Sequence, residues 1–371
     1  MDYFFIIFSL SMWLVGLFIL WQIRYPEDRG ECTTDAGKVS VIIPARDEED
    51  RLPFLLQSLQ KQTVQPGEVL VIDDGSSDNT AGTAESFNVP LIAAGKKPKG
   101  WVGKNWACWT GSKAAEYPIL VFLDADVILE DDGLAKLLST FTRENTPIAV
   151  QPYHTMKKPY EFLSAFFNII VAAGLGSFTM AGRHIQSAGM FGPCLICSKE
   201  NYFESGGHES VKETAVEDIA LGKSFRNAGF QFSLFGGKGS VRFRMYPENF
   251  KSMVEGWTKS MAAGAGTTSL LPLLLSIFWI SGGTVAFILI LRLVLFSQPV
   301  QTRAFFLAVY LLYTGQTWWM LRRIGNFGLL TSLFFPVHLM FFHIVFFRSF
   351  LMTSLKKEIK WKGRNIRVED K

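Results

Sequence analysis

The stretch "LVFLDADVIL" (residues 120–129) has the apolar run of a buried strand, interrupted by two carboxylates. Asp124 and Asp126 are two residues apart, so in extended backbone both side chains leave the same face of the strand. Two carboxylates this close repel each other, and burial increases the cost. A divalent cation that prefers oxygen ligands, Mg²⁺ or Mn²⁺, completed by phosphate oxygens and water, would offset that repulsion. In the alternative, one aspartate caps a helix expected near residue 130 and the other faces water.

Apolar runs of similar length occur on both sides of this stretch and alternate with helical segments. The expected strands are residues 39–45, 68–74, 89–94, 119–126 and 148–153. The expected helices between them are residues 50–62, 79–87, 103–116 and 130–144. Continuous apolar strands that alternate with helices predict an α/β fold, with a Rossmann-like, mostly parallel sheet and helices on both faces.

Polar residues follow three of these strands at their carboxyl ends. The first strand leads into "ARDEE" (residues 45–49), the second into "DDGSSDNT" (residues 73–80), and the fourth into the aspartate pair. Ligands of parallel α/β sheets bind beyond the carboxyl ends of the strands. The sequence therefore predicts an acidic, partly hydrated crevice at this edge of the sheet.

The two ends of the 371-residue chain have the composition of a membrane protein. Residues 3–21 carry no charge, and a helix of that length nearly crosses a hydrocarbon layer of roughly 30 Å. A cleaved signal peptide fits less well, because no basic segment precedes the run and no small-residue cleavage site follows it. The expected division is an N-terminal transmembrane anchor (1–24), a globular domain (38–247), an amphipathic interfacial helix (248–269), a membrane region (270–352) with apolar segments at 270–291, 304–321 and 327–347, and a basic tail (353–371).

Lysine and arginine residues near the spans predict the orientation in the membrane. None precedes the first span, whereas basic residues follow it, which places the N-terminus outside and the globular domain in the cytoplasm. The basic tail is also expected in the cytoplasm, although three full crossings would leave it outside. Residues 327–347 are expected not to cross but to follow a re-entrant path, since they contain Pro336, His338 and His343. A simple span with its histidines against a neighbouring helix is the alternative.

Charge and cysteine content exclude other classes. The formal net charge of +4 lies mostly in the tail, which suits anionic lipid headgroups better than nucleic acid. The four cysteines are Cys32, Cys108, Cys194 and Cys197. The last two form a lone C-x-x-C without a metal-spaced histidine, so zinc is not expected and the thiols are interpreted as reduced core residues.

Five segments occur in an order that resembles the nucleotide-sugar-dependent glycosyltransferases of family 2, which have the GT-A fold. They are "VSVIIPARDEE" (39–49), "VLVIDDGSSDNT" (69–80), "GWVGKNWA" (100–107), "LVFLDAD" (120–126) and "AVEDIALG" (215–222). Within that family, "GMFGPCLICSKENYFESGGH" (189–208) looks closest to the membrane glycosyltransferases of bacterial carotenoid synthesis. The resemblance implies a GT-A catalytic domain that transfers a sugar with inversion from a UDP-sugar, expected to be UDP-glucose, to a hydrophobic lipid or carotenoid acceptor.

The resemblance also implies roles for the residues that match the motifs. Asp218 would be the general base, supported by Glu217, and Asp124 and Asp126 would hold Mg²⁺ or Mn²⁺ on the diphosphate. The donor-binding residues would be Pro44, Ala45, Arg46, Glu48, Asp73, Asp74, Lys104 and Asp124. The acceptor-side residues would be Trp257, Lys259 and His208.

Some of these residues have a purely structural alternative. Asp73 and Asp74 begin a segment that forms Asx hydrogen bonds in many turns. Asp218 falls in the first turn of a helix expected to end at Gly229, where the helix dipole favours an acid without any chemical role.

The segment "GKKPKGWVGKNWA" (95–107) combines glycines, lysines and tryptophans. Lys97, Lys99 and Lys104 would neutralise a diphosphate beside the start of the helix expected near residue 103. Trp101 and Trp106 would cover a sugar or an acyl chain. A solvated basic loop is the alternative, and donor binding is assigned to Lys104 alone.

Two segments are candidates for the acceptor side. Residues 250–264 predict a helix whose apolar face carries Phe250, Met253, Val254, Trp257 and Met261. Residues 160–178 form either a second membrane-contacting helix or a buried core helix. The chain has "VEGWTKS" (254–260) where the processive polysaccharide synthases of the family carry Q-x-x-R-W, so sugar polymerisation is not expected.

Three other functions are alternatives to this one. The first is glycosyl transfer to another lipid, of the ceramide, hopanoid, diacylglycerol or polyprenyl phosphate type. A membrane-anchored binding protein on an inactive enzyme fold would tolerate loss of the acidic residues, yet all are present. A transporter would need many more spans and intramembrane charges.

Overall fold

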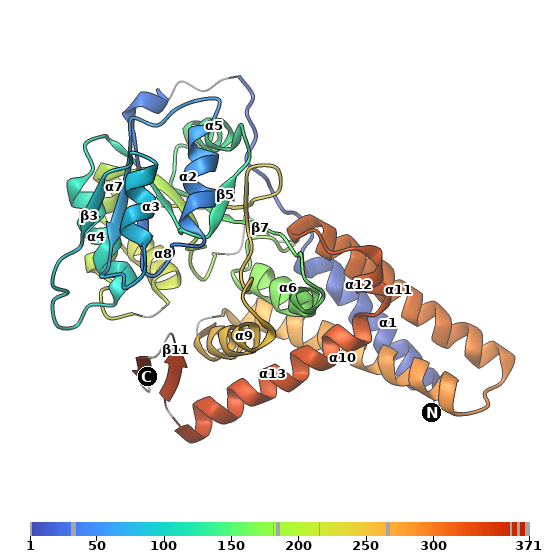
Figure 1. Cartoon of the computed structure of the whole chain (residues 1–371). Coiled ribbons are helices and arrows are strands. Elements are labelled where there is room, and N and C mark those ends of the chain that lie inside the picture. The colour runs from blue at the N-terminus through green and yellow to red at the C-terminus, as the bar shows by residue number, and fades with distance from the viewer. Residues whose placement is uncertain are drawn as a thin grey trace. The chain divides into compact units, whose positions relative to one another are not determined.

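The structure is a computed structural model that describes residues 2–30, 35–180, 182, 186–214, 216–264, 268–356, 358–361 and 364–367. It divides into two compact units, each built from separate stretches of the chain (Figure 1). The sheet unit comprises Arg24–Thr155 and Gly189–Arg244. The helical unit comprises Met1–Ile23, Met156–Ala188 and Met245–Lys371. Cys32 and the tail residues Lys357, Lys362 and Lys371 lie outside the described residues.

The sheet unit contains a seven-stranded sheet with the order β3-β2-β1-β4-β8-β6-β9. The strands are β1 (Val39–Ala45), β2 (Glu68–Asp73), β3 (Leu91–Ala93), β4 (Ile119–Leu123), β6 (Ile148–Gln151), β8 (Cys194–Ser198) and β9 (Ser233–Gly236). Neighbours are parallel except at β8, which is antiparallel to both β4 and β6. The predicted mostly parallel sheet is therefore confirmed, whereas the antiparallel strand was not predicted.

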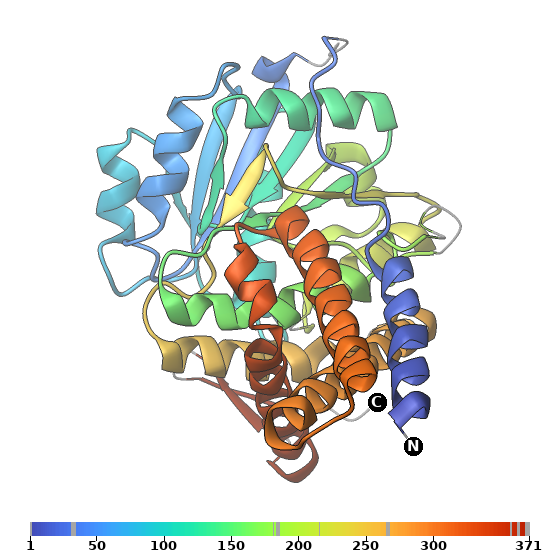
Figure 2. The same ribbon diagram turned by 90° about the vertical axis from the view of Figure 1, so that its right-hand side faces the viewer.

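Helices flank this central sheet (Figure 2). They are α2 (Leu52–Gln60), α3 (Thr80–Ser86), α4 (Gly103–Ala114), α5 (Gly133–Glu144), α7 (Lys199–Glu204) and α8 (Glu217–Asn227). Strand order proceeds outward from β1 to β3, and α4 then returns the chain past β1 to β4. Right-handed crossovers in opposite directions lie on opposite faces of a sheet, so α4 covers the face that α2 and α3 do not. The carboxyl ends of β1 and β4 thus border the point where strand order reverses, where sheets of this kind bind ligands.

The predicted fourth strand ends earlier than expected, and the chain after it joins a second, three-stranded sheet. It consists of β5 (Val127–Leu129), β10 (Val241–Phe243) and β7 (Tyr153–His154). β4 ends at Leu123, and the backbone turns before β5, with the amide of Val127 donating to the carbonyl of Asp124 at 3.1 Å. Asp124 and Asp126 lie in this connection, so the prediction of one continuous strand with both side chains on one face is wrong.

The helical unit is built mainly from α-helices. They are α1 (Asp2–Ile19), α6 (Ala165–Gly174), α9 (Phe250–Gly264), α10 (Leu270–Leu295), α11 (Val300–Ile324), α12 (Leu329–Leu333) and α13 (Phe335–Lys356). Two segments, Leu270–Leu295 and Phe335–Met352, are long and apolar enough to cross a membrane. Tyr3–Ile19 is an apolar helix of shorter length. The predicted segment 327–347 is divided between α12 and α13, and its path through the membrane, spanning or re-entrant, stays a prediction.

Hydrogen bonds join α1, α10 and α11 inside this unit. The Ser9 hydroxyl donates to the carbonyl of Gly282 at 2.9 Å, and the Tyr313 hydroxyl donates to the carbonyl of Ser9 at 3.1 Å. The Trp279 indole donates to Gln316 Oε1 at 2.8 Å. Apolar helices approach closely where a small residue leaves room for the neighbouring backbone. Gly282 of α10 is such a position, because side chains of both α1 and α11 lie against it.

We expect Gly282→Ala to lower the free energy of unfolding of the helical unit by about 1–3 kcal/mol, because packed helices would have to separate. The added Cβ would lie 2.1 Å from Tyr313 Oη and 2.3 Å from Met12 Cβ. A lower midpoint of thermal unfolding in detergent is the measurement. Gly315→Ala is the matched control, since no atom lies within 4 Å of its added Cβ. Equal midpoints for both variants would contradict this packing.

Helix α9 confirms the helix predicted at residues 250–264, and side chains of the same unit cover most of its apolar face, although Phe250 is 47% exposed. The Trp257 ring stacks on Phe167 of α6 with centroids 4.8 Å apart, and its indole donates to Ser164 Oγ at 2.9 Å. Met253 is fully buried. A position of α9 at the membrane surface stays a prediction.

Residues 160–178 begin with a 3₁₀ segment, Pro159–Ser164, and continue into α6. Phe166 and Phe167 of α6 are buried, which agrees with the core-helix alternative. Because Met156–Ala188 packs in the helical unit, the domain predicted as continuous over 38–247 is interrupted there. An all-round apolar helix packs as well against other apolar helices as in the core of an α/β domain, so its composition did not reveal the interruption.

Candidate active site

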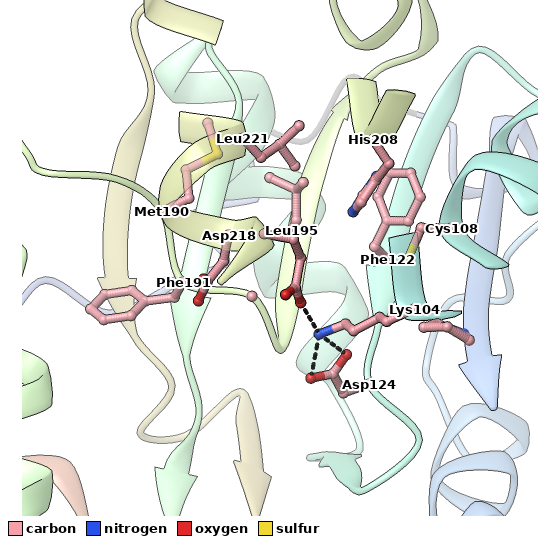
Figure 3. A pocket seen from close by; sticks show the side chains of 13 residues that line it. Lys104, Cys108, Phe122, Asp124, Met190, Phe191, Leu195, His208, Asp218 and Leu221 are labelled. Carbon is pink, nitrogen blue, oxygen red and sulfur yellow. Dashed lines mark hydrogen bonds and ion pairs between the residues drawn. The ribbon is translucent and has the colours of Figure 1, made fainter. Parts of the chain in front are cut away.

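A pocket of the sheet unit lies where β1 and β4 end. Its lining residues are Pro44, Lys104, Cys108, Phe122, Asp124, Met190, Phe191, Gly192, Leu195, His208, Glu217, Asp218 and Leu221. Figure 3 shows Lys104 and Asp124 reaching toward each other, with Asp218 on the other side of the same space. The pocket therefore brings together chemistry-bearing side chains that α4, the end of β4 and the first turn of α8 supply.

Lys104 joins two acids of this pocket. Its Nζ lies 2.7 Å from Asp124 Oδ1 and 3.0 Å from Asp124 Oδ2, and 2.9 Å from Glu217 Oε1. Burial alone would lower the pKa of Lys104, but the carboxylates of Asp124 and Glu217 raise it well above its ordinary value. Burial tends to raise the pKa of Glu217 and the ammonium of Lys104 outweighs it, so the Glu217 pKa is lowered. Glu217 is therefore ionised at neutral pH.

Asp218, the next residue, has a different environment. Its Oδ1 accepts a hydrogen bond from the Ile219 amide at 2.9 Å. Burial, and then the neighbouring Glu217 carboxylate, raise the pKa of Asp218 to about 7. A carboxyl group that titrates near neutral pH is suited to accept a proton. The two adjacent acids of α8 are thus separated in role, with Glu217 held as an ion-pair partner and Asp218 able to act as a base.

The two aspartates after β4 offer the oxygen donors that a divalent cation prefers, although Asp126 is not among the residues that line the pocket. Burial and the nearby Asp124 carboxylate raise the pKa of Asp126 to about 7, although the Arg51 guanidinium acts in the opposite direction. Burial also raises the pKa of Asp124, despite its contact with Lys104. Carboxylate oxygens are the ligands that Mg²⁺ and Mn²⁺ prefer, and a divalent charge would offset the cost of ionising both acids. Within the described residues no group of three or more acid, histidine or cysteine side chains is placed to hold a metal.

The loops after β1 and β2 contact each other. Arg46 Nη1 donates to Asp74 Oδ2 and to the carbonyl of Asp74, both at 3.2 Å. Asp73 Oδ1 accepts from the amide and hydroxyl of Ser76 at 3.0 and 2.5 Å. Asp73 therefore makes the turn contacts of the structural alternative, while Asp74 pairs with a cation. The amide of Glu48 donates to Thr80 Oγ1 at 2.9 Å, which ties the two loops together.

Asp74 also packs on the first residue of α4. A Cβ on Gly103 would lie 2.0 Å from Asp74 Oδ2. Gly103→Ala is expected to lower the free energy of unfolding by about 1–3 kcal/mol, despite the better helix propensity of alanine, because the carboxylate must move. Thermal unfolding measures this loss. In the double variant Asp74→Ala/Gly103→Ala most of the stability should return, and a double variant as unstable as Gly103→Ala would contradict the contact.

His208, which the resemblance assigns to the acceptor side, lines the pocket. It is 4% exposed, its Nδ1 lies 2.8 Å from the Tyr202 hydroxyl, and its ring is 5.4 Å from that of Phe122. Burial lowers the pKa of His208 to about 4, so the imidazole is neutral at pH 7. Trp257 and Lys259 belong to α9 of the helical unit, and their acceptor role stays a prediction.

The basic loop 95–102 has an aromatic cluster at its end. The rings of Trp101 and Trp106 are 5.1 Å apart, and the Trp106 indole donates to the carbonyl of Ala94 at 2.7 Å. Lys97 and Lys99 are not among the residues that line the pocket. Lys104 is the lysine of this segment that reaches it.

Several residues of the pocket could not be predicted from the sequence. Phe122 and Leu195 are ordinary strand residues, and their chemistry is the same as that of any core side chain. Gly189 and Gly192 belong to the segment 189–208 that carries the resemblance, and no role was predicted for either of them. Added Cβ atoms would lie 2.4 Å from Ile219 Cα and 3.1 Å from Asp218 Cβ, respectively. The G-x-x-G spacing was thus the available sign that this loop packs tightly on the start of α8.

Comparisons with known proteins agree with this architecture. The sequence profile described as Glycosyl transferase family 21 matches residues 83–371. The 4,4'-diaponeurosporenoate glycosyltransferase of Staphylococcus haemolyticus is 34% identical, with 97% of this chain and 97% of that protein covered. The protein of the same name from Staphylococcus aureus is 36% identical, over 89% of this chain and 88% of that protein. A solved mannosyltransferase from Pyrobaculum calidifontis, in complex with GDP-Man and Mn²⁺, is similar in fold, with a TM-score of 0.55 at 14% identity over 93% of this chain and 98% of that chain.

Proposed function

Because this chain belongs to glycosyl transferase family 21 and is a glycosyltransferase, we propose that it moves glucose from UDP-glucose to a hydrophobic carboxylic acid of the carotenoid type, forming a glycosyl ester. The resemblance to GT-A glycosyltransferases is confirmed. The sequence motifs resemble family 2, and the profile that matches the chain is described as family 21. The 34–36% identity to proteins named for a carotenoid acid supports the acceptor. The donor rests on the resemblance and on the acids of the pocket.

One observation supports the catalytic assignment above the others. Asp124, Lys104 and Glu217 are in direct contact, and Asp218 follows Glu217 in the first turn of α8. Asp124 and Asp126 would hold Mg²⁺ or Mn²⁺, which when bound supplies positive charge to the leaving diphosphate. Lys104 would add its own charge to that diphosphate, and the N-terminus of α4 would contribute backbone donors.

The acceptor decides what Asp218 does. An attacking alcohol must lose a proton, and Asp218 in its ionised form would accept it at a carboxylate oxygen. A carboxylic acid acceptor, with an ordinary pKa of about 4, is already ionised at neutral pH and attacks the anomeric carbon directly. In both cases the acceptor oxygen forms the new bond as the bond to the diphosphate breaks, on the opposite face of the sugar.

We also infer a multi-pass membrane protein with its sheet unit in the cytoplasm. The two long apolar helices and the basic residues that follow the first apolar segment support this orientation. Exposed apolar side chains on α10 and α13, such as Phe278 and Phe347, suit contact with lipid chains. Labelling of single introduced cysteines by a membrane-impermeant reagent tests it, and labelling of the sheet unit from outside intact cells would contradict it.

Release of UDP from UDP-glucose tests the proposed activity. We expect UDP release that depends on both a carotenoid carboxylic acid and Mn²⁺ or Mg²⁺, and that stops when EDTA is added. Mass spectrometry of the lipid product should show a glucosyl ester. Release with a ceramide or diacylglycerol but not with the carotenoid acid would move the function to another lipid, and no release with any acceptor would reject the enzyme assignment.

A further inference from the structure

Lys104 is placed where an incoming cation would have to bind. Both oxygens of Asp124 lie within 3.0 Å of its Nζ, at 2.7 and 3.0 Å. A divalent ion at Asp124 needs one of these oxygens, and a second positive charge so close to an ammonium is repelled. The ammonium and a metal ion therefore compete for Asp124.

A second acid holds Lys104 from the other side. Glu217 Oε1 is 2.9 Å from the same Nζ, and α8 fixes the Glu217 backbone. The four-carbon stem of lysine is flexible, so the ammonium can leave Asp124 while it keeps its contact with Glu217. Lys104 is the second residue of α4, and the start of a helix attracts phosphate groups. A diphosphate bound there would draw the ammonium away from Asp124.

We propose that Lys104 is a tethered cation that occupies Asp124 until a nucleotide diphosphate arrives, so that the divalent metal ion and the nucleotide bind together. This inference rests on the proposed function for the identity of the nucleotide. Toward the metal ion Lys104 is a positioning residue, because it acts on the metal site through Asp124, in addition to the contact with the diphosphate proposed above. Binding linkage is reciprocal, so the nucleotide strengthens metal binding by the same factor by which the metal strengthens nucleotide binding.

The first test measures Mn²⁺ binding to the detergent-solubilised full chain without any nucleotide. Free Mn²⁺ is followed at pH 8 by its electron paramagnetic resonance signal, which is lost on binding. Lys104→Met removes the competing charge, and we expect the Kd for Mn²⁺ to fall by about tenfold or more. Lys104→Arg keeps the charge and should bind Mn²⁺ as weakly as the wild type. An unchanged or higher Kd in Lys104→Met would overturn the proposal.

Lys113→Met is the matched control on the same helix. Lys113 Nζ lies 5.4 and 5.6 Å from the ring centroids of Trp106 and Trp109, and Lys113 is not among the residues that line the pocket. Its replacement should leave the Kd for Mn²⁺ unchanged, and a gain equal to that of Lys104→Met would also reject the proposal. Should Lys104→Met not fold, Lys104→Gln removes the charge with a polar side chain.

The second test repeats the Mn²⁺ titration with UDP present. In the wild type we expect UDP to lower the Kd for Mn²⁺ by a factor about tenfold larger than in Lys104→Met, because only the wild type gains by releasing Asp124. Equal factors would overturn the proposal. The titration without nucleotide is independent of the donor, so a failure of UDP to bind any variant would reject the proposed donor but leave the competition at Asp124 measurable.

Discussion

We expect Asp218→Asn to lower kcat with a long-chain alcohol acceptor by about 10²–10⁴-fold, because a general base is replaced by a neutral amide. With a carboxylic acid acceptor the same substitution should change kcat by less than about tenfold, because no proton has to be removed. Steady-state UDP release with both acceptors is the measurement. A loss of equal size with the two acceptors would contradict the assignment of Asp218 as a base.

The pH dependence follows from the Asp218 pKa of about 7, which burial and Glu217 raise from the ordinary value of 3.8. The base must be ionised, so kcat/KM with an alcohol acceptor rises with pH and levels off above about 7. Because folding disfavours the ionised form of Asp218, ionisation lowers the free energy of unfolding. This loss is absent below pH 3.8, where the carboxyl group is protonated in both the folded and the unfolded state, and it is complete above about pH 7, where the group is ionised in both.

Asp218→Asn should therefore unfold at a higher temperature than the wild type at pH 8, with a gain on the order of 4 kcal/mol. The gain should shrink as the pH is lowered toward 4. A variant that loses activity and gains stability is typical of an active-site acid. A lower midpoint of unfolding at pH 8 would show that Asp218 is a structural residue.

Asp126→Asn is expected to reduce UDP-glucose turnover by about 10²–10³-fold, because it removes one of the two carboxylates proposed to hold the metal. The affinity for Mn²⁺ in the presence of UDP should fall by at least about tenfold. Both quantities can be measured on the same detergent-solubilised preparation. The fold should be retained, since the burial that raises the pKa of Asp126 to about 7 makes its charge costly to the folded state.

Asp132→Asn is the matched control for this substitution. Asp132 follows the same turn region, but its carboxylate is 48% exposed and pairs with Lys136 at 2.8 Å. Its replacement should change neither turnover nor Mn²⁺ affinity. Turnover of Asp126→Asn within about threefold of the wild type, at saturating Mn²⁺, would remove Asp126 from the metal site.

The first half of the sheet could be predicted because its sequence pattern is local. The runs 39–45 and 68–74 became β1 and β2, and the helices in this part of the chain lie within a few residues of the predicted bounds. The single strand predicted at 148–153 is divided at Pro152 between β6 and β7, which belong to different sheets. The end of the fourth strand was misplaced because two acids spaced by one residue fit both an extended strand and a turn. Period alone cannot separate these two conformations.

The site was predictable only as a set of acids. Asp124 and Asp218 carry motifs and both line the pocket, whereas Asp73, Asp74 and Asp126 are not among its lining residues. The contact of Lys104 with Glu217 joins residues 113 positions apart, and no spacing rule covers such a pair. Likewise, residues 156–188 belong to the helical unit because their apolar side chains pack against its helices. Amino-acid composition cannot predict which apolar surface a segment will pack against.

The antiparallel strand β8 has a consequence for synthesis of the protein on the ribosome. β8 supplies the neighbour that β4 lacks on one side, and it is made only after the whole segment 156–188. At 5–20 residues per second, the edge of β4 waits roughly 4–15 s for its partner. During that interval an open strand edge and the newly made apolar helix α6 coexist in one nascent chain, which are the conditions for mispairing.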